Sequence, residues 1–147
     1  MELPDIGIFS SDDVIDWTDV IQGGLGTCFI KASMAALAEY PDMVRATFKN
    51  EEVNDEGIYN VQFYIRGKPW VVTIDDHLLF NTIYTTPLVF ASTSVDEQAI
   101  WGAMLEKAYA KVMGNYMNSE AGYTVNGIRI LTGIPVYSYS NDFYDYD

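Results

Sequence analysis

The chain has 147 residues, a length typical of one domain with a hydrophobic core of its own. It has 8 Lys and Arg residues and 21 Asp and Glu residues, so the formal net charge is -13. Such a surface repels phosphate backbones and anionic membranes, so we expect no nucleic-acid and no membrane partner, and it suits basic partners or divalent cations. The single cysteine, Cys28, excludes an intrachain disulfide and a zinc site built from several thiolates.

Targeting signals are not visible in the sequence. Residues 1–5 lack the basic and apolar segments of a secretory signal, and no stretch approaches the roughly 20 apolar residues of a membrane helix. We therefore expect a cytoplasmic protein in a reducing setting.

The first part of the chain predicts two helices after an acidic start. Residues 1–21 are acidic and mixed, and residues 22–27 form a glycine-rich turn. Residues 28–39 are strong helix formers with one lysine among them, which predicts a helix buried on most sides. Pro41 then opens a second short helix that runs to Phe48, because proline is favoured at the first helical position.

The middle of the chain is typical of β-structure. Residues 58–65 and 70–74 are rich in β-branched and aromatic side chains and flank a turn that contains Gly67. Two such runs around a glycine predict a β-hairpin. Residues 87–91 predict a further strand.

The last third predicts two more helices. Ser94 and Glu97 have the spacing of a capping box, which predicts a helix start there, and apolar residues then recur near a 3.6-residue period over 100–112. Gly114 is placed to end that helix. A short helix is expected at 126–131, ending at Gly133. The elements together predict the α+β class, with helices packed on a small antiparallel sheet.

Cys28 is the residue with the clearest chemical meaning, because it begins a predicted helix straight after the glycine-rich turn. Backbone N–H groups at a helix N-terminus lack partners and carry a partial positive charge, which favours the nucleophilic thiolate form of a cysteine. Gln22, six positions earlier, has a side-chain N–H that can stabilise a developing oxyanion next to the backbone N–H of Cys28. The alternative is a buried structural cysteine on an apolar helix.

Four motifs, in the same order along the chain, resemble the calpain family of cysteine proteases. Residues 22–29, Q-G-G-L-G-T-C-F, are similar to the family's active-site signature Q-G-x-L-G-D-C-W. Residues 57–64 and 70–76 are similar to its hairpin, which closes on V-x-V-D-D. Residues 105–111, L-E-K-A-Y-A-K, are followed by G-N-Y and match the family's helix, and residues 131–133, L-T-G, match the end of its first subdomain.

The resemblance implies a papain-like protease core made of two subdomains, of which this chain carries the first. That subdomain spans 22–136 between an acidic lead-in (1–21) and an acidic aromatic tail (137–147), with a central buried helix that begins at the nucleophile. Cys28 is then the catalytic nucleophile and Gln22 the catalytic oxyanion residue, and the substrates are proteins or peptides. The family's second subdomain supplies the histidine base and its orienting asparagine, on the same longer chain or an associated chain. Without that base, we expect no peptide turnover by this chain alone.

His77 is the only histidine and directly follows Asp75 and Asp76. Papain-type enzymes place their histidine about 130–150 residues beyond the cysteine, which falls past Asp147. His77 is therefore expected to be a surface residue at a strand end and not the base.

The resemblance also implies a calcium site. Three positions depart from the family, two beside the nucleophile and one among the calcium ligands. Thr27 replaces an aspartate, Phe29 replaces a tryptophan, and Ala99 or Gln98 stands where a calcium-binding carboxylate is expected. The family's other calcium carboxylate matches Asp19. Glu97, close to Ala99, is a substitute ligand, and calcium is the one cofactor implied; the alternative for the acidic segment is a solvated acidic face.

Two functions remain open from the sequence. The first is the cysteine-bearing half of a calpain-like endopeptidase, which the retention of Cys28 and Gln22 favours. The second is a catalytically inactive calpain-fold interaction or structural module, which the changes at Thr27, Phe29 and Ala99 favour.

Overall fold

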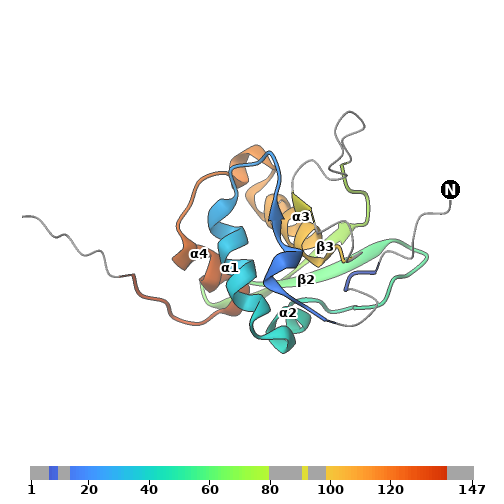
Figure 1. Ribbon diagram of the computed structural model, residues 1–147, viewed down its shortest axis with the longest axis horizontal. Helices are drawn as coiled ribbons and strands as arrows, with labels where there is room; N and C mark the ends of the chain where they lie inside the picture. The colour runs from blue at the N-terminus through green and yellow to red at the C-terminus, as the bar shows by residue number, and fades with distance from the viewer. Residues whose placement is uncertain (1–6, 10–13, 80–90, 93–98, 139–147) are drawn as a thin grey trace, which may run out of the picture.

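The computed structural model describes residues 7–9, 14–79, 91–92 and 99–138. These residues form a mixed α+β structure, as the sequence predicts (Figure 1). In chain order the elements are η1 (Trp17–Asp19), β1 (Ile21–Gln22), α1 (Cys28–Ala38), α2 (Pro41–Thr47), β2 (Ile58–Ile65), β3 (Lys68–Asp75), β4 (Ala91–Ser92), α3 (Trp101–Met113), η2 (Met117–Ser119) and α4 (Thr124–Thr132).

The β-hairpin of β2 and β3 confirms the prediction for the middle of the chain. The strands are antiparallel and in register from the pair Ile58–Asp75 to the pair Ile65–Lys68. The turn residues Arg66 and Gly67 have φ of 53° and 74°, the positive values that a two-residue hairpin turn with matching twist requires. Alternate side chains are buried along the strands, so one face of the hairpin belongs to the core, with the buried residues Tyr59, Val61, Phe63, Val72 and Ile74.

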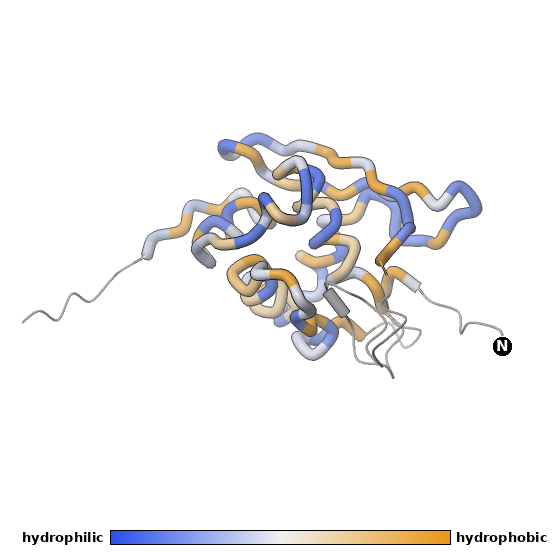
Figure 2. The backbone as a smooth tube through the Cα atoms, turned by 90° about the horizontal axis from the view of Figure 1, so that it is seen from above, coloured by the Kyte–Doolittle hydropathy of each residue, from blue (hydrophilic) through white to orange (hydrophobic). Residues whose placement is uncertain are grey.

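The helices cover that buried face. α3 packs against β3, whereas α2 and α4 pack against β2, and α1 lies against α2, α3 and α4 (Figure 1). Residues of the acidic start take part as well, because Ile8, Phe9 and Ile15 belong to the same buried cluster. Figure 2 shows hydrophobic and hydrophilic residues mixed over short stretches of the backbone, as expected when each element buries only one side.

Helix boundaries follow the sequence signals except at the starts of α3 and α4, and α4 begins at Thr124, two residues before the predicted position. α1 and α2 begin at Cys28 and Pro41 as predicted, α3 ends at Gly114, and α4 ends at Gly133 in the left-handed conformation. The predicted start of α3 is wrong: its N-cap is Ile100, not Ser94. The reason is a tertiary contact, since Ile100 and Trp101 donate their backbone N–H groups to the carbonyl of Ile8.

Some predictions fall outside the described residues, namely the capping-box residues Ser94 and Glu97, most of the strand at 87–91, and the tail beyond position 138. β1 was not foreseen. It pairs antiparallel with β4, whose first residue is the last residue of the predicted strand, and Gln22 lies opposite Ala91. None of the described helices is long and apolar enough to cross a membrane.

Candidate active site at the start of α1

Cys28 is an exposed residue at the first position of α1. Its N-cap is Thr27, and the carbonyl of Thr27 accepts the first helical hydrogen bonds, from Ile30 (3.1 Å) and Lys31 (3.1 Å). The Thr27 side chain makes no capping bond. Within the described part of the chain, the backbone N–H of Cys28 therefore has no acceptor, and it lies at the positive end of the helix dipole. This is the geometry in which a thiolate and an oxyanion are stabilised.

Gln22 lies on β1, at the other end of the glycine-rich turn, with its side chain exposed. Its Nε2 donates to the carbonyl of Leu25 at 3.1 Å, and the N–H of Thr27 donates to the same oxygen at 2.8 Å. Because both bonds converge on one atom, the amide of Gln22 is held beside the segment that leads into Cys28. Nε2 carries two hydrogens, so this bond leaves a second N–H for a ligand.

The turn is supported from outside by residues that follow η2. The N–H of Gly26 donates to Glu120 Oε1 at 3.2 Å, and the N–H of Ala121 donates to the carbonyl of Gly26 at 3.1 Å. Gly122 approaches so closely that an added Cβ would lie 2.8 Å from the ring of Phe29. Phe29 is buried and packs edge-on against Tyr109, with ring centroids 5.9 Å apart. Phe29 thus anchors the start of α1 in the core.

A buried polar cluster lies beneath the first turn of α1. The hydroxyl of Thr27 donates to Glu106 Oε1, and Lys31 Nζ lies 3.2 Å from the same oxygen. All three side chains are buried: Thr27 is 0% exposed, Lys31 4% and Glu106 1%. Burial lowers the pKa of Lys31, and the carboxylate of Glu106 opposes that shift. Lys31 of α1 and Glu106 of α3 therefore form an ion pair inside the protein.

The predicted calcium ligand Asp19 is engaged in a structural role. It is 1% exposed, and its Oδ2 accepts hydrogen bonds from Trp101 Nε1 (2.8 Å) and from the N–H of Asp16 (3.0 Å). The second predicted ligand, Glu97, lies outside the described residues. Calcium takes six to eight oxygen ligands, so Asp19 by itself does not make a calcium site, and the calcium assignment stays a prediction.

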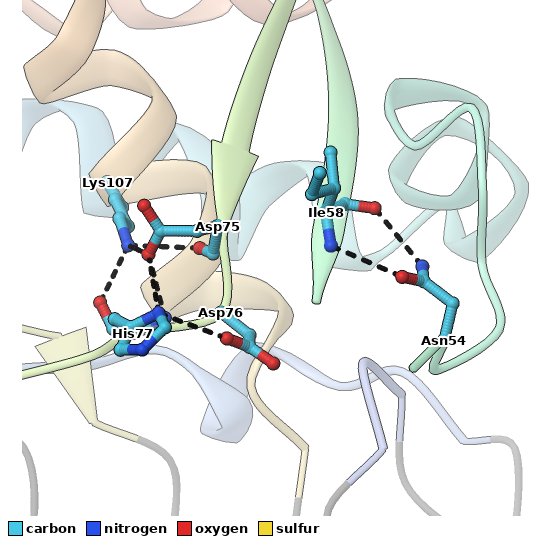
Figure 3. A network of polar contacts seen from close by, with 6 residues as sticks. All are labelled: Asn54, Ile58, Asp75, Asp76, His77 and Lys107. Carbon is cyan, nitrogen blue, oxygen red and sulfur yellow. Dashed lines mark hydrogen bonds and ion pairs between the residues drawn. The ribbon is translucent and has the colours of Figure 1, made fainter. Parts of the chain in front are cut away.

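His77 lies at the end of β3, away from the bonds that organise the α1 N-terminus. Its Nδ1 is 3.2 Å from Asp75 Oδ1 and 3.3 Å from Asp76 Oδ1, and its side chain is 91% exposed (Figure 3). Lys107 of α3 reaches the same group, with Nζ 2.5 Å from Asp75 Oδ1 and 2.6 Å from the carbonyl of His77. The two aspartates and the histidine are close enough together to suggest a metal site, but the ammonium of Lys107 already occupies Asp75.

An apolar groove lies at the opposite end of α1 from Cys28. Its volume is about 320 Å³, and its lining comes from the second half of α1, the start of α2, and α4. The lining contains no carboxylate, imidazole or amine among the described residues Ser33, Ala36, Leu37, Tyr40, Met43, Ile128, Leu131, Thr132 and Ile134. The groove therefore brings no catalytic group to the cysteine.

The structure adds three residues to the surroundings of Cys28 that the sequence did not single out for this role: Lys31, Glu106 and Glu120. A signal existed for the first two, because a lysine and a glutamate each occur inside a strongly apolar helix. Nothing in the sequence links positions 31 and 106, which only the packing of α1 on α3 brings together.

Comparison with known proteins places most of the chain in one family. Residues 5–145 match the family described as "Calpain family cysteine protease". The chain is similar to the calpain-type cysteine protease DEK1 of Zea mays, with 36% identity over 81% of this chain and 5% of that protein. It is also similar to the calpain-2 catalytic subunit of Gallus gallus and to calpain-8 of Homo sapiens, with 36% identity over 79% of this chain and 16% of each. The chain thus spans a small part of the length of these curated relatives.

Proposed function

Because this chain belongs to the calpain family of cysteine proteases, we propose that it is the cysteine-bearing half of a calpain-like endopeptidase, the first subdomain of a papain-like core. The observation that carries the proposal is the exposed Cys28 at the uncapped N-terminus of α1, with the amide of Gln22 held beside the turn that precedes it.

In the proposed reaction the thiolate of Cys28 attacks the carbonyl carbon of a peptide bond and forms a C–S bond. The negative charge moves to the carbonyl oxygen, where the N–H of Cys28 and the second N–H of Gln22 stabilise it. The C–N bond then breaks, the amine leaves with a proton from a histidine, and a thioester remains that water hydrolyses. That histidine belongs to a second subdomain, so this chain by itself is proposed to be inactive.

The test joins this chain in one polypeptide to the histidine- and asparagine-bearing second subdomain of a calpain. We expect hydrolysis of a flexible peptide, complete loss with Cys28→Ala, and a fall in kcat of about 10²- to 10³-fold with Gln22→Ala, the typical effect of removing one oxyanion donor. Asn126→Ala is the matched control, because Asn126 is an exposed amide on α4 and is expected to leave kcat unchanged. A joined protein that folds and binds the peptide but does not cleave it would falsify the endopeptidase assignment.

One observation favours the second candidate, an inactive interaction or structural module of the calpain fold. The Gln22 amide already donates to the carbonyl of Leu25, and such a bond also suits a purely structural glutamine. Turnover by the joined protein separates the two cases. Alkylation does not, because Cys28 is exposed in the folded protein in either case.

A further inference from the structure

Thr27 is a residue type that normally caps a helix, yet its hydroxyl is directed elsewhere. A threonine at the N-cap usually accepts a hydrogen bond from the backbone N–H two or three positions later. Here the hydroxyl donates to Glu106, and no side-chain cap bond forms. Of the two N–H groups that such a cap can bind, that of Ile30 donates to the carbonyl of Thr27. The N–H of Phe29, next to the exposed Cys28, is left without the cap.

The acceptor of this hydrogen bond is a charged side chain in the protein interior. Glu106 lies on α3, is 1% exposed, and is neutralised by Lys31 from α1. Burying two charges is costly, and apolar replacements of such pairs are often neutral or stabilising, so the burial of this pair is weak evidence that it serves stability. Lys31 also donates to the carbonyl of Ile21 at 3.4 Å, directly before Gln22. The pair therefore connects the residues that flank both Cys28 and Gln22.

We propose that Glu106 and Lys31 are positioning residues for Cys28, which hold the Thr27 hydroxyl away from the start of α1 and so keep the backbone N–H of Phe29 available to the thiolate. The proposal rests on the proposed function and deepens it. Glu106 acts through Thr27, and Lys31 acts by holding the Glu106 carboxylate in position inside the protein.

The test measures alkylation of Cys28 by iodoacetamide over a range of pH, and the label is unambiguous because the chain has one cysteine. In Lys31→Met/Glu106→Leu the Thr27 hydroxyl is free to cap the helix. We expect alkylation at neutral pH to slow by about 2- to 5-fold, the size of a helix-terminus effect on a nearby charge, with the pH profile displaced upward. Adding Thr27→Val removes the hydroxyl and is expected to restore the rate. Circular dichroism identifies the folded variants.

A double variant that alkylates as fast as the original chain while folded overturns the proposal, and so does a triple variant that stays slow. If the double variant does not fold, Thr27→Val alone decides. We expect it to leave the rate unchanged, whereas a faster rate means that the hydroxyl already caps the helix. The order of these rates is independent of the proposed function, whose failure would appear as absent turnover in the joined enzyme.

Discussion

Asp75 shows how one exposed side chain is tuned by its neighbours. A hydrogen bond from Lys107, together with the backbone N–H of His77, lowers the pKa of Asp75 from 3.8 to about 2 (Figure 3). The unfolded chain thus binds a proton here at a higher pH than the folded chain does. The resulting stability is fully present above pH 3.8 and is lost as the pH falls toward 2.

We therefore expect Asp75→Asn to lower the free energy of unfolding by less than about 1 kcal/mol at pH 7, because the pair is exposed and screened. The difference between the variant and the original chain should vanish as the pH approaches 2. Urea unfolding at pH 7, 5, 4 and 3 measures it. Asp55→Asn, at an exposed aspartate in the loop before β2, is the control with no expected change. A difference that stays constant down to pH 3 contradicts the assignment.

At the scale of elements, α1 is held by close contact with α4 as well as by hydrophobic burial. The hydroxyl of Ser33 on α1 lies 2.9 Å from the carbonyl of Phe29 and 3.1 Å from that of Thr124, and its one hydrogen is shared between these two acceptors. Gly127 on α4 faces it so closely that an added Cβ would lie 2.3 Å from Ser33 Oγ. The two helices can lie this close together only because position 127 has no side chain.

Gly127→Ala is expected to destabilise the protein by about 1–3 kcal/mol, since Ser33 must move and the helix contact must open. The higher helix propensity of alanine, about 1 kcal/mol, offsets only part of this. Chemical denaturation measures the change, with Asn126→Ala, at the preceding exposed position, as the matched control. An unfolding free energy equal to or above that of the original chain would show that α1 and α4 are not in close contact.

At the scale of the whole molecule, the net charge of -13 opposes compaction. Surface charges repel one another over distances comparable to the Debye length, which is about 30 Å at 0.01 M salt and about 8 Å at 0.15 M. The folded state concentrates these charges more than the unfolded chain does. Added salt should therefore favour folding.

We expect the Tm to rise when KCl is increased from about 0.01 M to about 0.15 M, as the Debye length shortens. Asp55→Asn/Glu56→Gln, at exposed acidic positions, should make that rise smaller. Lys68→Gln, at an exposed basic position, should make the rise in Tm larger. The control is that the acidic and the basic substitutions change the rise in opposite directions. A Tm that is unchanged or falls with salt contradicts net repulsion as a destabilising force. Differential scanning fluorimetry is sufficient for the measurement.

Much of this protein is determined by its sequence alone. Helix signals such as Pro41 and Gly133, and the Arg66-Gly67 turn, act within a few residues, so the elements that they define formed where expected. The position of Cys28 at a helix start follows in the same way from the glycine-rich turn before it, whereas its exposure is shown only by the structure. Family membership is likewise a property of the ordered motifs.

Only the tertiary structure decided how the surroundings of Cys28 are arranged. The start of α3 moved to Trp101 because backbone groups of the N-terminal segment pair with it, and no local signal encodes that contact. The Thr27–Glu106 bond joins positions 79 residues apart. Local propensity reports on neighbours in sequence, whereas a buried charge is stable only beside its partner in space. The sequence therefore determined which helix carries the cysteine, and packing determined which groups hold the start of that helix.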